Sequence, residues 1–525
     1  MKNFNIIKKF AKAAFGLLAL VSVSCEDIID LTPYNNVSEA SAFSTPSLVA
    51  LSVTGVYNAA QLGYYDAAYR GYPFGAAFIE QGDCRGEDAV NVGTFYQLTY
   101  TATYSTTTAN NVWMWSDSYR LINRCNIIIE GVKKAGETGV ITSAKALEYE
   151  AEARFLRALT YHELLIHFAR PYKHTPDASH PGVPYHETPF TTAGAIEQGL
   201  KVGRSSVADV YSKILTDLEF AETNLPAKAD RTGNLKITRA NKGAAVAVKT
   251  RIYMHLGQFD KVKTEAAKFL TGGTLAGVYS LTTDPAGPFT APYNNTESIF
   301  GLESSASNNP GVNAALASQY NRRQLVAISP IIWRNSSWLS DDKRRAESTF
   351  VVTTSGGAKF TNKYKDGTNY TDPSPVIRYA EVLLNLAEAY ARTNDVANGL
   401  TYLNMVRNRS LANAATQAYK VTDFADNVAL LAKILDERRI EFVLEGRRWS
   451  DISRLQKDPY FPINGIPAKI ANAVPAGSLY TLGTPYSGAL GVATIPYDDF
   501  RFLWPIPQAE INANPILAEQ QNPGW

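Results

Sequence analysis

Residues 146–168 read ALEYEAEARFLRALTYHELLIHF, and this stretch decides the fold class. Its apolar residues recur at spacings of three and four, which is the pattern of a helix that buries one face. We expect Ser143 to cap this helix and Pro171 to end it. The buried stripe is predicted to consist of Leu147, Ala151, Phe155, Ala158, Leu159, His162, Leu165 and Ile166.

The same spacing recurs along most of the chain. It predicts helices over 109–132, 206–225, 377–391, 396–409 and 428–454, and a pair within 240–270 that is joined at Leu256-Gly257-Gln258-Phe259. Helix pairs with short connections are the unit of helical repeats, and this joint resembles a tetratricopeptide turn. We find no alternation of strands with helices, so a Rossmann or TIM architecture is unsupported. The prediction is a mainly α fold with a tetratricopeptide-like scaffold over 109–270 and 375–455.

Long segments between the predicted helices are rich in Gly, Pro, Asn, Thr and aromatic residues. They cover 63–108, 271–374 and 456–525, and each is longer than loops without a function usually are. The whole chain has 29 Tyr and 22 Phe, and tyrosine is the ring that tolerates water. We therefore expect one domain over 41–525, with ligand-binding insertions at 63–108 and 271–374, a few short strands, and a C-terminal loop region over 456–525.

The first 24 residues have the layout of a secretory signal peptide. Lysines precede an apolar run from Ala13 to Val23, which is too short to span a bilayer, and small residues lead to Cys25. The sequence VSVSC (21–25) is similar to a bacterial lipobox, although Ser22 replaces the usual aliphatic residue. We expect removal of 1–24, acylation (palmitate) of Cys25 and a tether over 25–40. The alternative is an ordinary secretion signal in which Cys25 is incidental.

The charge, the cysteines and the histidine spacing limit which partners, disulfides and metal sites the chain can have. The formal net charge is +2, which argues against nucleic acid as a partner. An exported compartment permits a disulfide between Cys84 and Cys125, but two buried free thiols are the expectation. His162 and His167 lie five residues apart rather than the four that a zinc helix needs, so no metal is predicted.

Two groups of charged residues raise the question of catalysis. Glu80, Asp83, Glu87 and Asp88 lie in the first insertion and offer the pair of carboxylates that glycoside hydrolysis requires. We expect them instead to form a solvated or ligand-contacting face. The charged residues of 437–454 are spaced for ion pairs within one helix, which indicates a structural network. Trp113, Trp115 and Tyr119 lie on a helical stripe and are assigned to the core.

Several segments read together resemble one family, the SusD/RagB proteins. In chain order they are WSDSYRLINRCN (115–126), EARFLRA (152–158), VIRYAEVLLNLAEA (376–389), LNMVRNR (403–409), ERRIEFVLEGRRWSD (437–451), and the closing motifs WPIP (504–507), EINANP (510–515) and QNPGW (521–525). Cys125 and Trp525 are small departures from the family pattern, which often has Ala and Tyr there. The resemblance extends from the lipobox to the last residue.

The resemblance implies a non-catalytic lipoprotein of the outer membrane, facing the cell exterior. Family members cover a TonB-dependent transporter of the SusC type and capture oligosaccharides, or in some cases peptides, for import. They present their ligand from the two insertions, without a cofactor or metal. The matching ligand-binding positions here are Asp83, Arg85, Asp88, Asn91, Phe95, Tyr96, Asn308, Asn309, Tyr320 and Trp333. Glycan capture is therefore the first hypothesis, peptide capture the second, and a secreted glycoside hydrolase the remote third.

Overall fold

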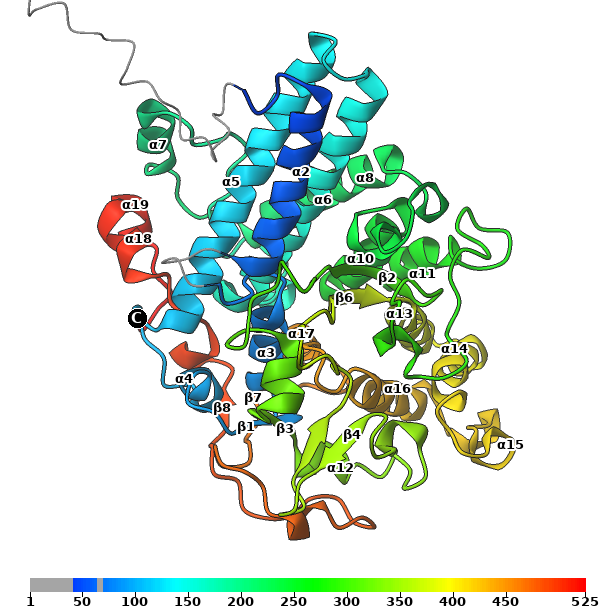
Figure 1. Cartoon of the computed structure of the whole chain (residues 1–525). Coiled ribbons are helices and arrows are strands. Elements are labelled where there is room, and N and C mark those ends of the chain that lie inside the picture. Colours follow the sequence, from blue (N-terminus) through cyan, green and yellow to red (C-terminus); the bar gives the residue numbers. More distant parts are fainter. Residues whose placement is uncertain (1–40, 64–68) are drawn as a thin grey trace, which may run out of the picture.

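Three long helices lie side by side at the N-terminal end of the part of the chain that the computed structural model describes, residues 41–63 and 69–525. They are α2 (Pro46–Leu62), α5 (Ala109–Glu137) and α6 (Ser143–Phe168), drawn in blue and cyan in Figure 1. The cap of α6 is Thr142, whose hydroxyl accepts from the Lys145 amide at 3.2 Å, so the prediction of Ser143 was wrong by one residue. Leu147 is 43% exposed and does not belong to the buried stripe. Cys25 and its tether lie outside the described residues.

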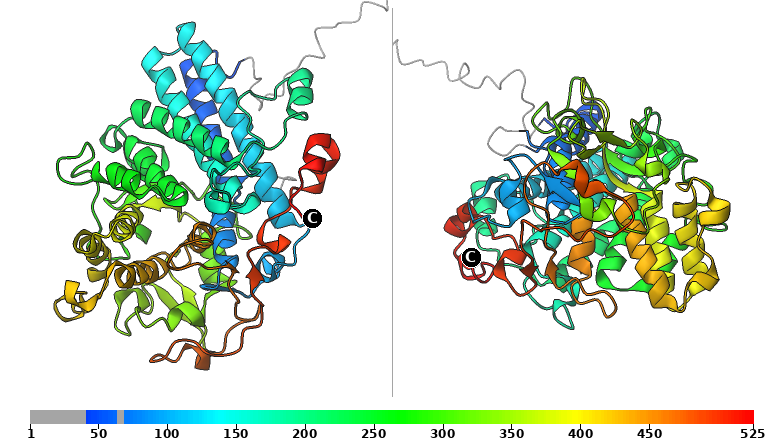
Figure 2. Two further views of the ribbon diagram at one scale, coloured as in Figure 1. Left: turned by 180° about the vertical axis from the view of Figure 1, so that it is seen from behind. Right: turned by 90° about the horizontal axis from the view of Figure 1, so that it is seen from below.

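The chain then continues as a series of helices, each packed against its neighbours. These are α8 (Val207–Asn224), α10 (Lys242–Leu256), α11 (Phe259–Ala267), α13 (Tyr379–Arg392), α14 (Val396–Asn408) and α16 (Asn427–Glu441). They form an arc that is visible from the front in Figure 1 and from behind in Figure 2. Gly257, with φ of +68°, makes the turn between α10 and α11. The predicted helical-repeat scaffold is confirmed.

Short antiparallel strands connect the two insertions. One sheet has the order β1-β3-β5-β4, formed by Ala89–Asn91, Val326–Ile328, Lys359–Thr361 and Val351–Thr353. Ala89 of the first insertion pairs with Ile328 of the second. Two further pairs are β2 (Ser298–Leu302) with β6 (Ser374–Arg378), and β7 (Gly465–Ile466) with β8 (Ile495–Pro496). The first sheet therefore fixes the two insertions against each other.

Shorter helices fill the insertions and the C-terminal region. They are α3 (Ala76–Cys84), α4 (Gln97–Thr101), α7 (Ala193–Gly199), α9 (Leu235–Thr238), α12 (Pro330–Trp333), α15 (Ala414–Gln417), α17 (Arg448–Arg454), α18 (Gln508–Ala513) and α19 (Pro515–Glu519). Every residue of α3 is buried, so this part of the first insertion belongs to the core. Cys84 and Cys125 are buried and unpaired, as expected.

The predicted helix over 428–454 is interrupted. Helix α16 ends at Glu441, the backbone takes positive φ at Leu444 (+59°) and Gly446 (+73°), and α17 begins at Arg448. Charged groups of this region consequently pair with other elements rather than mainly with each other. Glu445, for example, accepts from Arg378 Nε at 2.9 Å and from Lys363 Nζ at 2.6 Å. The network is structural, as predicted, but it joins distant segments.

Arg378 is the centre of this buried network. It lies at the end of β6, and its guanidinium donates to the carboxylates of Glu297 (2.8 Å), Glu441 (2.6 Å) and Glu445 (2.9 Å). Burial raises the pKa of Glu441, but Arg409 and Arg378 outweigh it and hold that pKa well below its usual range. Glu441 therefore stays charged inside the protein, and it depends on its cationic partners.

The C-terminal residues close the structure against α6. The Asn522 side chain donates to the carbonyl of Phe168, the last residue of α6, and to that of Trp504, both at 2.8 Å. Arg204 donates to Asn522 Oδ1 at 2.9 Å. Figure 1 shows this red segment beside α5 and α4. We call residues 504–525 the C-terminal strap.

Candidate ligand-binding site

The C-terminal end of α2 is the point where the two insertions meet. Gly63, with φ of +63°, ends the helix, and the amides of Arg70 and Gly71 donate back to the Leu62 carbonyl at 3.2 and 3.0 Å. The first insertion thus folds over the helix end. From the second insertion, Ser304 accepts from the Gln61 side chain at 2.8 Å. Residues from both insertions are therefore bonded to α2 within one turn of its end.

A group of aromatic rings, of which Phe95 is exposed, lies beside this point. Phe95 stacks on Trp113 with ring centroids 5.7 Å apart, and Tyr96 meets Phe95 edge-on at 4.9 Å. The Arg70 guanidinium lies 5.3 Å from the Phe95 ring and 5.4 Å from the Trp113 ring. Phe95 is 39% exposed and Trp113 is half-buried. We call Arg70, Phe95, Tyr96 and Trp113 the aromatic platform.

The aromatic platform has the chemistry that carbohydrate recognition needs. A ring with an exposed face covers the apolar C–H face of a sugar, because both surfaces are poorly hydrated. The adjacent guanidinium supplies donors for hydroxyl groups at the rim. Phe95 and Tyr96 were among the predicted positions, but Tyr96 is 4% exposed and therefore buried; Arg70 was not predicted, and Trp113 was assigned to the core. The sequence signal for Phe95 and Tyr96 was the aromatic content of the first insertion.

The polar residues of the second insertion lie in a loop beside α2. Asn308 is exposed and accepts from the Asn58 amide of α2 at 3.2 Å. Asn309 donates to the carbonyls of Ser305 (2.7 Å) and Asn369 (3.3 Å), so it holds the loop in shape. Of the two asparagines, Asn308 is the one whose side chain faces solvent.

The acidic residues of the first insertion are buried, so the expectation of a solvated or ligand-contacting face was wrong. Asp83 accepts from the Tyr320 hydroxyl at 2.6 Å and from the Gly446 amide at 2.8 Å. Burial raises the pKa of Asp83 to about 7. Tyr320 is itself fully buried. Asp83 and Tyr320 thus join α3 to the second insertion and to the turn before α17.

Glu80 is also buried, and arginines of α16 and α17 neutralise the remaining two acids, Glu87 and Asp88. Asp88 accepts from Arg439 Nε at 2.9 Å, and Glu87 accepts from Arg448 Nε at 3.0 Å. Burial raises the pKa of Glu87, but Arg448 and Arg439 outweigh it and lower that pKa to about 2. A general acid needs a proton near neutral pH, and Glu87 holds none. This arrangement is that of a structural clamp and gives the hydrolase hypothesis no support.

Four further predicted positions are also buried, and one of them is Tyr96 of the aromatic platform. The Arg85 guanidinium lies 3.4 Å from the Trp449 ring centroid, bonds His167 Nδ1 at 2.8 Å and donates to the Phe502 carbonyl at 2.7 Å. Asn91 donates to Asn472 at 2.7 Å. Trp333 is 5% exposed. In this structure the predicted positions that reach the surface are Phe95, Asn308 and, in part, Asn309.

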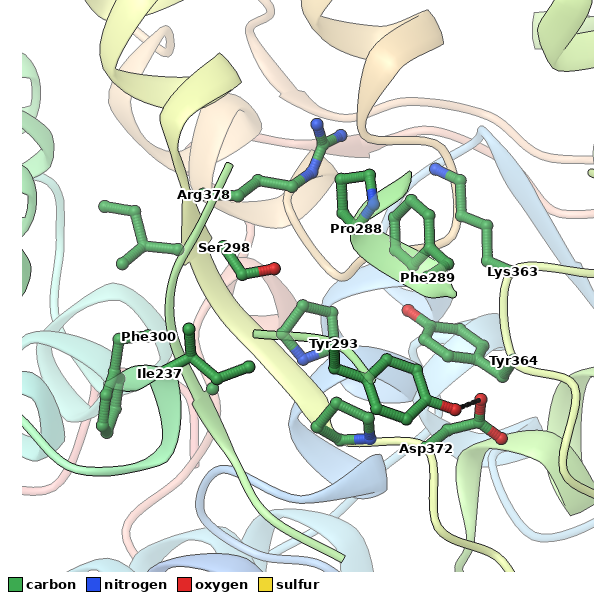
Figure 3. A pocket seen from close by; sticks show the side chains of 14 residues that line it. Ile237, Pro288, Phe289, Tyr293, Ser298, Phe300, Lys363, Tyr364, Asp372 and Arg378 are labelled. Atoms are coloured by element: carbon green, nitrogen blue, oxygen red, sulfur yellow. Dashed lines mark hydrogen bonds between the residues drawn. The ribbon is translucent and has the colours of Figure 1, made fainter. Parts of the chain in front are cut away.

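A small internal cavity of about 30 Å³ lies near Arg378. Figure 3 shows Phe289, Tyr293 and Tyr364 around it, with the Tyr293 hydroxyl donating to Asp372 at 3.1 Å. This volume suits about one water molecule and is far below the roughly 300 Å³ of small-molecule sites. Over the described ranges we find neither a metal-binding group of His, Cys, Asp and Glu nor a helix long and apolar enough to cross a membrane.

Comparison with known proteins agrees with this architecture. Residues 333–525 match the model of the SusD family, and residues 29–254 match a model described as starch-binding associating with outer membrane. SusD-like protein P2 of Formosa agariphila is 24% identical over 86% of this chain and 91% of its own.

Solved structures extend the comparison. A SusD superfamily protein from Bacteroides fragilis is 26% identical and superimposes with a TM-score of 0.72, over 90% of this chain and 99% of its own. Surface glycan-binding protein A from Bacteroides fluxus is 21% identical, with a TM-score of 0.66 over 92% of this chain and 100% of its own. The second likeness concerns the fold alone.

Proposed function

Because the chain belongs to the SusD family, we propose that it is a cell-surface lipoprotein that captures oligosaccharides and passes them, unaltered, to a TonB-dependent transporter of the SusC type. The observation that carries the proposal is the aromatic platform. Its exposed Phe95 ring and adjacent Arg70 guanidinium match the apolar face and hydroxyl rim of a sugar. A protein that hands its ligand on should bind it with a Kd of about micromolar to millimolar.

The acids of the first insertion support a binding role rather than hydrolysis. Glu87 and Asp88 are engaged by arginines, and Asp83 is enclosed by Tyr320 and Gly446. An acid–base pair would need access to the glycosidic oxygen and to water. The description of the family model that matches residues 29–254, starch-binding, favours glycans over peptides as the ligand.

Affinity electrophoresis of the mature protein in gels that contain single polysaccharides tests the ligand class. A Phe95→Ala variant should bind the retained polysaccharide about fivefold to tenfold more weakly, because the ring that covers the sugar is lost. Phe500→Ala is the matched control, since Phe500 is 40% exposed against 39% for Phe95. Retention by no polysaccharide, together with binding to a peptide panel, would replace glycan capture by peptide capture.

The proposed anchor is Cys25, and the proposed location is the outer membrane. Acyl chains on Cys25 would hold the mature chain at the membrane, since each buried CH₂ contributes about 0.8 kcal/mol. Cys25→Ser should release the protein from washed outer membranes into the soluble fraction. Isolation of the wild-type protein in mild detergent should bring a large β-barrel protein with it. If the lipid-free variant sediments with membranes as the wild type does, the anchor is elsewhere.

A further inference from the structure

A groove of about 420 Å³ runs along α2, and the C-terminal end of this helix also bonds the backbone of Arg70 of the aromatic platform. Its walls are α2, α9 and the loop after β2, and Gln61 of its lining precedes Leu62, to which the Arg70 amide is bonded. Its volume falls within the roughly 300 to 1,000 Å³ of small-molecule sites. Leu235, which is 43% exposed, provides an apolar surface within it. We call this hollow the α2 groove.

Two side-chain amides face each other across the α2 groove. The Asn58 amide nitrogen donates to Asn308 Oδ1 at 3.2 Å, and this contact is exposed. Within the described part of the chain, Asn58 Oδ1 and Asn308 Nδ2 have no protein partner. One acceptor and one donor are thus left side by side. Each sugar hydroxyl both donates and accepts, so two neighbouring hydroxyls match this pair.

The charge of the α2 groove favours an uncharged ligand. Its one lining arginine, Arg239, is bound to the Glu152 carboxylate through Nε at 2.6 Å and through its terminal nitrogen at 2.9 Å. Tyr57 also donates to that carboxylate at 2.6 Å, which fixes the wall. Glu303 is exposed, and no ion pair to it exists among the described residues. The guanidinium in the groove is therefore neutralised, whereas the Glu303 carboxylate is free and repels anionic ligands.

We infer that the α2 groove is a second carbohydrate subsite, which binds an uncharged segment of the oligosaccharide held on the aromatic platform. This inference rests on the proposed function and adds to it the substrate class, a neutral glycan rather than one carrying uronate or sulfate groups. Because both surfaces adjoin the end of α2, one chain of several sugars engages them together. Short oligosaccharides that fill only one surface bind more weakly than long ones.

The test measures binding of the mature, soluble protein by calorimetry, with neutral oligosaccharides of increasing length (starch-, xylan- and mannan-derived) and with oligogalacturonate as the anionic probe. Asn58→Ala and Asn308→Ala should each weaken the neutral ligand about fivefold, as expected for one lost hydrogen bond. Gln198→Ala removes an exposed amide from α7 and should bind as the wild type does. Glu303→Lys should change the Kd for the neutral ligand by no more than about twofold and should lower the Kd for oligogalacturonate.

Each outcome separates this inference from the proposed function. If Phe95→Ala weakens a neutral glycan but both asparagine variants bind it as the wild type does, the groove inference is overturned and the platform stands. Tighter binding of oligogalacturonate than of neutral glycans by the wild type overturns the assigned substrate class. If no oligosaccharide binds at millimolar concentration, the proposed function fails, and this inference fails with it.

Discussion

The clearest test of the buried architecture is Asp83→Asn. The Asp83 carboxyl lies between the Tyr320 hydroxyl and the Gly446 amide, and burial raises its pKa from 3.8 to about 7. Asn has the same shape and keeps an oxygen that accepts from the Gly446 amide, so the variant should fold. What the variant loses is the titration, because an amide carries no acidic proton.

The sign and size of the effect follow from linkage. Below about pH 4 the Asp83 carboxyl is protonated in the folded and the unfolded chain. From about pH 4 to pH 7 the unfolded chain releases the proton and the folded protein keeps it, so stability falls by about 1.4 kcal/mol per pH unit. Over the interval between 3.8 and 7 the wild type loses about 4 kcal/mol relative to Asp83→Asn, which has no such slope.

Urea unfolding followed by tryptophan fluorescence at pH 4, 5.5 and 7 measures this difference. The free energy of unfolding of the wild type minus that of the variant should fall steadily as the pH rises. Tyr320→Phe offers a second check, since loss of the hydroxyl that donates to Asp83 should raise the pKa of Asp83 further and extend the fall to pH values above 7. A difference that stays constant within about 1 kcal/mol, or that grows with pH, would refute the assignment of Asp83 as a buried, protonated acid.

Other substitutions test the scaffold by the same unfolding assay. Arg378→Met should lower the free energy of unfolding by about 3 to 5 kcal/mol, because the buried carboxylates of Glu297, Glu441 and Glu445 each lose one of their cationic partners. Lys201→Met removes an exposed ion pair and should change the free energy of unfolding by about 0.5 kcal/mol at most. If the Arg378 and Lys201 variants lost the same stability, the buried network would not have the structural role assigned to it. Gly82→Ala should cost at least about 2 kcal/mol, since its Cβ would lie 2.1 Å from the Gly446 carbonyl oxygen. Gly55→Ala meets no atom within 4 Å and should stabilise α2 by about 0.5 to 1 kcal/mol; destabilisation there would show that α2 is packed differently.

The helices were predictable because their signals are local. The apolar spacing of 146–168 and the turn at Gly257 depend on residues within a few positions of one another. The interruption after Glu441 was not predictable in the same way. It depends on Glu445 reaching Arg378 and Lys363, which lie 67 and 82 positions earlier in the chain. Intrahelical pairing is the simpler interpretation of that sequence until the fold is known.

The site was predicted by region rather than by residue, for the same reason. Asp83 and Phe95 both lie in an aromatic, polar insertion, and composition does not distinguish them. The partners that bury Asp83 are Tyr320 and Gly446, which are 237 and 363 positions away. Phe95 has its stacking partner, Trp113, much closer along the chain, and that half-buried ring keeps it at the surface. Composition therefore indicates the region but not which of its acids or rings reach the surface.

The C-terminal strap has a consequence for the order of events during synthesis. The Phe168 carbonyl at the end of α6 and that of Trp504 both receive their hydrogen bonds from Asn522, more than 350 positions after Phe168. A ribosome releases residue 168 long before residue 522. The hydrogen bond from Asn522 to the end of α6 can therefore form only after the last segment has been made. The packing at the end of α6 is therefore completed only after the last residues of the chain have been made.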